Sequence, residues 1–222
     1  MTHPASGNAA LATRDLKHVW HPCTQMQDHE SVPLVPIVRG EGAWLIDAEG
    51  RRYLDGISSW WTNIFGHANP RIAAALADQA STLEHVIFAG FTHEPAIELA
   101  EKLVAITPPG LDKVFFADNG SSAVEVALKM SFHYWLNQGH GEKTRFIALS
   151  GSYHGETLGA LSVSDVALYR KTYAPLLLTP FLTPSPDAYE GEPGENPQQT
   201  AARRLRELRT LLESHAHETC AV

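Results

Sequence analysis

Residues 113–123 read Lys-Val-Phe-Phe-Ala-Asp-Asn-Gly-Ser-Ser-Ala, a short apolar strand at 113–117 that turns sharply into the helix expected over 123–137. Gly120 lets the backbone approach a ligand closely, and the serines that follow it offer hydroxyl donors. The first N–H groups of a helix are unpaired and lie at the positive end of its dipole, which suits a phosphate. The alternative is a plain helix N-cap, which Asn and Ser commonly form.

The chain after this stretch continues in the same strand–loop–helix order. We expect a strand at 145–149, a glycine-containing loop at 151–157, a third strand at 176–181 and a helix at 198–214. This alternation predicts an α/β fold with a parallel sheet. The composition of residues 219–222 is that of the first residues of a strand. A domain does not normally end there, so we expect the chain to continue beyond Val222.

The chain before residue 113 is organised differently. Residues 1–14 are expected to be a disordered lead-in, followed by a helix-like start at 16–25. A β-hairpin is predicted from 44–46 and 52–54, because Gly50 between them can take a positive φ. Two amphipathic helices are expected at 69–84 and 95–106.

Two further segments carry candidate chemistry. Tyr153, in the loop after the 145–149 strand, lies where parallel α/β sheets bind ligands, and its ring could stack on a flat cofactor. An ordinary loop with a hydrogen-bonded His154 is the alternative. At 60–61 two tryptophans are adjacent; one of such a pair is usually core, and the other could wall an apolar substrate pocket.

Composition narrows the classes of function. The formal net charge of −8 argues against nucleic acid or an anionic membrane as the main partner. Two widely separated cysteines fit a reducing compartment. The first residues lack the order of a signal peptide, and no run approaches the ~20 apolar residues of a membrane span. We therefore expect a soluble cytoplasmic protein, and the spacing of the histidines gives no reason to predict a metal site.

Four segments, in order and suitably spaced, carry a resemblance to a known family: 56–70 (GISSWWTNIFGHANP), 86–103 (VIFAGFTHEPAIELAEKL), 116–130 (FADNGSSAVEVALKM) and 153–159 (YHGETLG). They resemble the class III, fold-type-I aminotransferases, which use pyridoxal 5'-phosphate (PLP). The resemblance implies the N-terminal part of a fold-type-I PLP-dependent transferase. Residues 15–66 then belong to its small domain, and 67–222 to an incomplete PLP-binding large domain with a mostly parallel sheet.

Within this class, the tryptophan pair, His21-Pro22 and 88–96 (FAGFTHEPA) resemble one subfamily. Its members are homodimers that transfer an amino group from S-adenosylmethionine to 8-amino-7-oxononanoate, giving 7,8-diaminononanoate in biotin biosynthesis. Two alternatives remain open. One is another class III aminotransferase with an ω-amino acid, ornithine or diamine donor. The other is a non-catalytic α/β module that binds a ligand or a protein partner.

The resemblance also implies roles for cofactor-binding residues. Gly120 and Ser121 match the phosphate-binding pair of the family, and Tyr153 matches the aromatic residue that stacks over the pyridoxal ring. None of the lysines of this chain matches the context of the Schiff-base lysine, which is therefore expected beyond Val222. The resemblance accordingly assigns no catalytic residue here, and we expect the chain by itself to be inactive.

Four residues are implied in substrate binding. Trp60 matches a residue that lines the pocket, and Tyr153 contacts substrate as well as cofactor. Glu156 stands where the family often has Asp, which keeps the carboxylate on a side chain one methylene longer. Cys23 stands where a substrate-recognising Tyr is expected, and a thiol has neither the reach nor the ring of a phenol.

Overall fold

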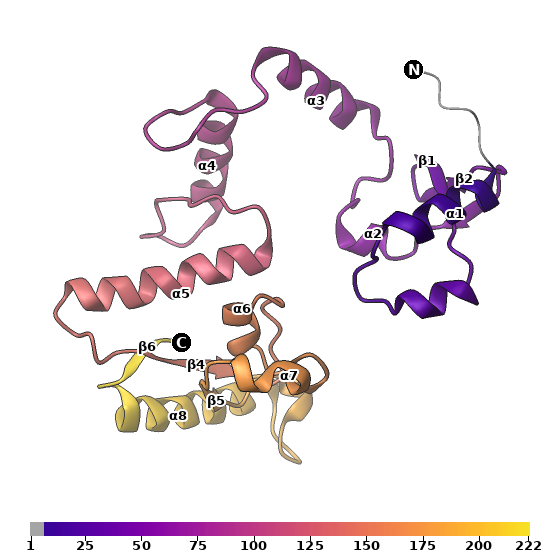
Figure 1. Cartoon of the computed structure of the whole chain (residues 1–222). Coiled ribbons are helices and arrows are strands. Elements are labelled where there is room, and N and C mark those ends of the chain that lie inside the picture. The colour runs from indigo at the N-terminus through magenta and orange to yellow at the C-terminus, as the bar shows by residue number, and fades with distance from the viewer. Residues whose placement is uncertain (1–6) are drawn as a thin grey trace. The chain divides into compact units, whose positions relative to one another are not determined.

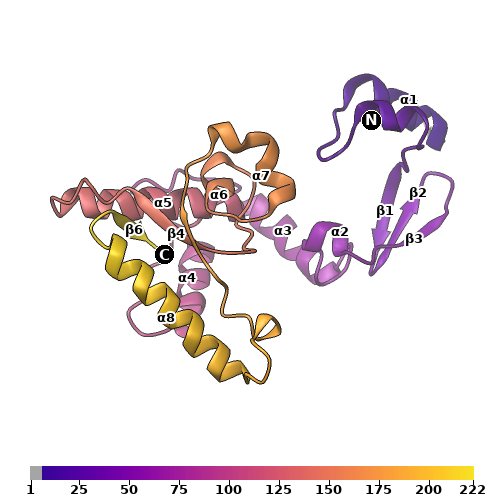
Figure 2. The ribbon, with the colours of Figure 1, turned by 90° about the horizontal axis from the view of Figure 1, so that it is seen from below.

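The computed structural model describes residues 7–222, and the contacts within the chain form two compact units, Met1–Ile97 and Glu98–Val222 (Figures 1 and 2). The division expected from the sequence, between residues 66 and 67, falls inside the first unit. The assignment of residues to the small and large domains of the family stays a prediction. None of the described helices is both long enough and apolar enough to cross a membrane.

The first unit begins with helix α1 (Asn8–His18), followed by the 3-10 turn η1 (Met26–Glu30). The prediction of disorder over 1–14 is wrong for residues 8–14, and residues 1–6 lie outside the described residues. Two hydrogen bonds join the start of α1 to the hairpin: the Asn8 amide donates to Asp47 Oδ2 at 2.8 Å and accepts from the Ala48 N–H at 3.0 Å. These contacts join residues 39 and 40 positions apart, so a local pattern does not reveal them.

An antiparallel sheet follows, in the order β1 (Ile37–Glu41), β2 (Trp44–Asp47), β3 (Arg52–Leu54). The predicted β2–β3 hairpin is confirmed, and Gly50 has φ +83° in its turn. Burial raises the pKa of the Asp47 carboxyl, but hydrogen bonds from Arg51, Asn8 and Tyr53 outweigh it and hold the pKa well below its usual range.

Three helices follow along the chain: the short α2 (Ser58–Trp61), then α3 (Pro70–Thr82) and α4 (Glu94–Ile106), inside which the first unit ends at Ile97 and the second begins at Glu98. Both helices predicted from periodicity are confirmed. The start of α3 follows from local chemistry, because Pro70 stands at its first turn and the Asn69 side chain accepts the N–H groups of Arg71 and Ile72.

The second unit contains a parallel sheet in the order β5 (Phe181–Thr183), β4 (Arg145–Leu149), β6 (Thr219–Ala221). The predicted strand at 145–149 is confirmed. The strand predicted at 176–181 is wrong: Pro175 lies in the 3-10 turn η2 (Ala174–Leu176), and β5 begins only after Pro180, which has no N–H to donate.

The strand predicted at 113–117 is also absent from the described chain, where these residues form no ladder. A strand exists only by pairing with another, and no described strand pairs with this segment. Phe115 is accordingly 64% exposed.

After α4, the helices of this unit are α5 (Gly120–Asn137), α6 (Leu158–Ser162), α7 (Ala167–Tyr173) and α8 (Pro197–His215), with the 3-10 turn η3 (Ala188–Glu190) before α8. In Figures 1 and 2, α5 and α8 lie on opposite sides of the sheet. In the hydrophobic core of this unit, the buried side chains pack against α5; they are Phe146, Ala148, Val163 and Cys220. The indole of Trp135 donates to the Cys220 carbonyl at 2.7 Å, which ties α5 to β6.

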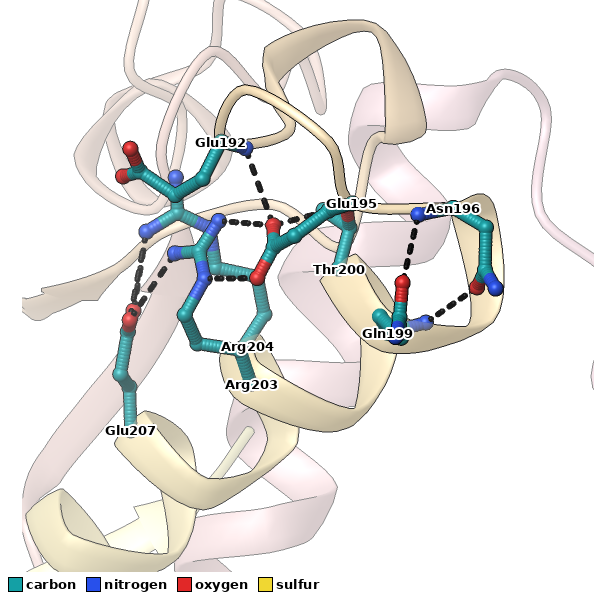
Figure 3. A network of polar contacts seen from close by, with 8 residues as sticks. All are labelled: Glu192, Glu195, Asn196, Gln199, Thr200, Arg203, Arg204 and Glu207. Atoms are coloured by element: carbon teal, nitrogen blue, oxygen red, sulfur yellow. Dashed lines mark hydrogen bonds and ion pairs between the residues drawn. The ribbon is translucent and has the colours of Figure 1, made fainter.

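The start of α8 is held by a polar network (Figure 3). Asn196 and Gln199 form a capping box. Before it, Glu195 accepts two hydrogen bonds from the Arg203 guanidinium, at 2.9 and 2.8 Å, and Arg203 also bonds to Glu207 at 3.3 Å. The bonds from Arg203 lower the pKa of Glu195 to about 2, so this carboxylate is ionised at neutral pH.

Candidate active site

The predicted phosphate site lies at the N-terminus of α5. Its cap is Asn119, whose side chain accepts the Ser122 N–H at 2.9 Å and whose carbonyl accepts the Ala123 N–H at 3.0 Å. The N–H groups of Gly120 and Ser121 lie in the first turn, where a helix provides no acceptor of its own. The N-cap and the phosphate site therefore do not exclude each other, because Asn119 forms the cap and its two successors stay available to an anion.

The second predicted segment, the loop after β4, meets this helix terminus. Ser121 Oγ accepts the backbone N–H of Glu156 at 3.2 Å. Gly155 makes the approach possible, because a Cβ at this position would lie 1.9 Å from Ser121 Oγ. The φ of Gly155, +122°, is also one that other residues rarely adopt. Two motifs 35 residues apart in sequence are thus in direct contact.

Glu125 makes a second connection, which the sequence prediction did not include. Its Oε1 accepts the N–H of Gly159 at 2.7 Å and of Ala160 at 3.3 Å. A hydrogen bond from the Thr157 side chain, followed by these backbone bonds, lowers the pKa of Glu125. The sequence signal for this connection is that Glu125 lies four residues after Ser121 and therefore on the same face of α5. The start of α6 is thereby fixed beside the start of α5.

Tyr153 and Glu156, predicted separately, are partners in the structure. The Tyr153 hydroxyl donates to Glu156 Oε1 at 3.1 Å. The Tyr153 ring lies 5.8 Å from the Tyr169 ring, between centroids, at an interplanar angle of 58°. Tyr153 is 54% exposed, so much of its surface is available for stacking on a ligand.

The structure therefore brings together four of the six residues predicted for the site: Gly120, Ser121, Tyr153 and Glu156. The other two, Trp60 and Cys23, belong to the first unit, and their part in the same pocket stays a prediction. Both are exposed, and both have a positive φ, of 68° and 56° respectively.

Comparison with known proteins identifies the family. The family model described as Aminotransferase class-III matches residues 25–222. The chain belongs to the class III aminotransferases. As a class III chain it carries the α/β fold of the fold-type-I transferases, which confirms the predicted fold class.

Two curated relatives are named adenosylmethionine-8-amino-7-oxononanoate aminotransferase. The protein from Helicobacter pylori is 48% identical over 212 residues, covering 95% of this chain and 46% of its own length. The protein from Geobacter sulfurreducens is 46% identical over 220 residues, covering 99% of this chain and 49% of its own length. This chain spans about half the length of the curated relatives it matches.

Solved structures give the same picture. The enzyme of that name from Methanocaldococcus jannaschii superposes with a TM-score of 0.82 at 39% identity, over 96% of this chain and 45% of its own. A thermostable (S)-enantioselective omega-transaminase from Thermomicrobium roseum superposes with a TM-score of 0.86 at 31% identity, over 97% of this chain and 49% of its own.

Proposed function

We propose that the protein encoded by the complete gene is a PLP-dependent aminotransferase of biotin biosynthesis. It takes an amino group from S-adenosylmethionine and passes it to 8-amino-7-oxononanoate, giving 7,8-diaminononanoate. The observation that supports PLP as the cofactor is the junction between the N-terminus of α5 and the loop after β4, which Ser121 and Glu156 form. The names of the relatives support the two substrates.

The residues of the junction fit a phosphorylated aromatic cofactor. The first N–H groups of α5 and the Ser121 hydroxyl are donors for a phosphate. Space is open beside Gly120, where an added Cβ would meet nothing within 4 Å. When bound, PLP supplies the electron sink that lets an amine and a ketone exchange their amino group. The described chain contributes binding and orientation.

Each site residue then has a defined task. Gly120 and Ser121 hold the phosphate, and Tyr153 stacks on the ring. Glu156 holds the Tyr153 hydroxyl at 3.1 Å, which limits how far the phenol can swing. Trp60 lines the pocket that binds first the donor and then the acceptor. Cys23 replaces the expected phenol beside that pocket, so it leaves more room there and one strong hydrogen-bond donor fewer.

The second candidate function is transfer from an ω-amino acid, ornithine or diamine donor. Two observations favour it: the superposition on the omega-transaminase and the presence of Cys23. The tryptophan pair favours S-adenosylmethionine. We further propose that the enzyme is a cytoplasmic homodimer, as the resemblance implies.

The test is half-reaction kinetics on the protein from the complete gene, loaded with PLP. S-Adenosylmethionine should convert the cofactor absorbance to that of its amine form, and 8-amino-7-oxononanoate should reverse the change. Conversion by ornithine or an ω-amino acid alone would select the second candidate. No conversion with any amine, despite bound PLP, would favour a non-catalytic α/β module.

A further inference from the structure

The loop that carries the tryptophan pair is closed at its base on the hairpin. The Asp55 N–H donates to the Ala43 carbonyl at 2.9 Å, and His67 exchanges two backbone hydrogen bonds with Gly42, at 2.8 and 3.1 Å. Gly40 adds to this closure, because a Cβ at this position would lie 2.6 Å from the His67 Cβ. Both ends of the loop from Asp55 to His67 are thus fixed to adjacent residues of one turn.

The apex of this loop has an unfavourable backbone conformation. Four consecutive residues of α2 have positive φ, of 49°, 47°, 68° and 65°: Ser58, Ser59, Trp60 and Trp61. For L-residues each such conformation is costly, and runs of them are rare because the Cβ crowds the following carbonyl. None of the four is glycine, so other contacts must hold the turn.

Those contacts converge on one carboxylate. Asp55 Oδ1 accepts the Ser59 N–H at 2.9 Å, and Oδ2 accepts the Ser59 hydroxyl at 2.7 Å. The same Oδ2 lies 2.7 Å from His67 Nε2. The side chains of Asp55 and His67 are only 6% and 14% exposed, so little water competes for these bonds. Bonds from the Ser59 N–H and hydroxyl, and then from His67, lower the pKa of Asp55 to about 2.

The rings themselves contribute little to holding the turn. Trp60 is 64% exposed and Trp61 is 74% exposed. The backbone of the turn, more than packing around the rings, therefore decides where they point.

We propose that Asp55 and His67 are positioning residues that fix the left-handed turn at 58–61, orient Trp60, and so set the shape of the substrate pocket. The inference rests on the proposed function, in which Trp60 lines that pocket. Neither residue touches substrate or cofactor in this scheme; both act through the backbone of the loop between them. A pocket wall on an exposed loop gains its rigidity from such supporting bonds.

The first test reads the tryptophans directly, without activity. The protein from the complete gene is labelled with 5-fluorotryptophan, and the Trp60 resonance is assigned with Trp60→Phe. Asp55→Asn and His67→Ala should shift or broaden the Trp60 and Trp61 resonances. Ser59→Ala, which removes only one of the converging bonds, should do so to a smaller extent and serves if the other variants fail to fold.

The matched control is Asp47→Asn. Asp47 is the other buried aspartate of this unit, with a side chain 0% exposed, and its bonds to Arg51 and Tyr53 do not involve the turn. Its variant should leave the Trp60 resonance in place.

The backbone strain of the turn also predicts a rescue. Adding Ser58→Gly to Asp55→Asn should return the Trp60 resonance towards wild type, because glycine adopts positive φ without cost. Unchanged tryptophan resonances in Asp55→Asn, His67→Ala and Ser59→Ala would overturn the proposal.

The second test is kinetic. Asp55→Asn should raise the KM of donor and acceptor by about tenfold while PLP retention stays at the wild-type level, since a displaced wall weakens substrate binding and not the phosphate site. A shifted Trp60 resonance with unchanged KM would overturn the link between the turn and the pocket. If the wild-type enzyme does not use S-adenosylmethionine, the proposed substrates fail, whereas the fluorine spectra still decide whether Asp55 and His67 hold the turn.

Discussion

The hydroxyl oxygen of Ser121 accepts a hydrogen bond of 3.2 Å from the backbone nitrogen of Glu156. This bond joins the first turn of α5 to the loop after β4, and it leaves the hydroxyl proton of Ser121 free to donate to a ligand. Ser121 therefore has two tasks at once: it fixes the loop that carries Tyr153, and it offers a donor to the phosphate.

Ser121→Ala should weaken PLP retention without unfolding the protein. A hydrogen bond to a charged group is worth about 1.5–3 kcal/mol, so the loss corresponds to about ten- to a hundredfold in affinity. The measurement is cofactor retention on dialysis of the protein from the complete gene. Ser131→Ala is the matched control, because Ser131 lies on the same helix and its hydroxyl bonds to the Ala127 carbonyl. Equal retention by the Ser121 variant, its control and wild type would show that the Ser121 hydroxyl fixes the loop after β4 but does not bind the phosphate.

Gly155→Ala should destabilise the protein more than Gly151→Ala. Both glycines have positive φ, +122° and +72°, but only the Cβ at Gly155 collides, at 1.9 Å from Ser121 Oγ; at Gly151 nothing lies within 4 Å. Backbone strain of this kind costs about 1–3 kcal/mol, and the collision adds to it at Gly155 alone. Urea unfolding of the two variants measures the difference. Equal losses would mean that the junction is not close-packed.

Glu195→Gln should flatten the dependence of stability on acid pH. The Glu195 pKa falls from 4.5 to about 2 through the bonds from Arg203 (Figure 3). A carboxyl with a lowered folded-state pKa stabilises the fold fully above its unfolded pKa, and this stabilisation is lost as the pH falls from 4.5 towards 2. Wild type should therefore lose more stability than the variant in that window, measured by unfolding at several pH values.

The control for this experiment is Glu98→Gln. Glu98 pairs with Lys102 at 3.4 Å, but its side chain is 56% exposed, where such pairs contribute little. This variant should follow the wild-type pH curve. A Glu195 variant that does the same would show that the pair with Arg203 is not stabilising.

Cys23→Tyr should raise kcat/KM for S-adenosylmethionine by about tenfold, equivalent to about 1.4 kcal/mol, because it restores the aromatic wall and the hydroxyl donor that the family resemblance implies. Trp60→Ala should instead lower kcat/KM in both half-reactions, since the same wall serves donor and acceptor. Half-reaction kinetics with several donors measures both. Unchanged S-adenosylmethionine turnover in the Cys23 variant, with ornithine or an ω-amino acid preferred, would refute the substrate assignment.

Elements whose causes are local were predicted well. Strand β4, helices α3, α4 and α8 and the β2–β3 turn follow from periodicity, proline, caps and Gly50, all of which act within a few residues. The two strand errors have different causes. The strand expected at 113–117 was inferred from an apolar run, yet a strand requires a partner, and pairing is a property of the whole sheet. In the strand expected at 176–181, Pro175 and Pro180 delay the start of β5 to Phe181.

The candidate site divides in the same way. The sequence predicted a helix N-terminus directly after Gly120 and Ser121, with the helix beginning at residue 123, because unpaired N–H groups are a local consequence of any helix start; α5 in fact begins at Gly120. The contacts around this terminus come from tertiary packing: Glu156 bonds to Ser121 and Gly159 bonds to Glu125, over sequence separations of 35 and 34 residues. In the first unit, the bond of His67 to Asp55, over 12 residues, has the same kind of cause. Such contacts depend on how the elements pack, and their residues are ordinary in sequence: a serine, a glutamate, a histidine. Their roles follow from the partners that packing brings within hydrogen-bonding distance of them.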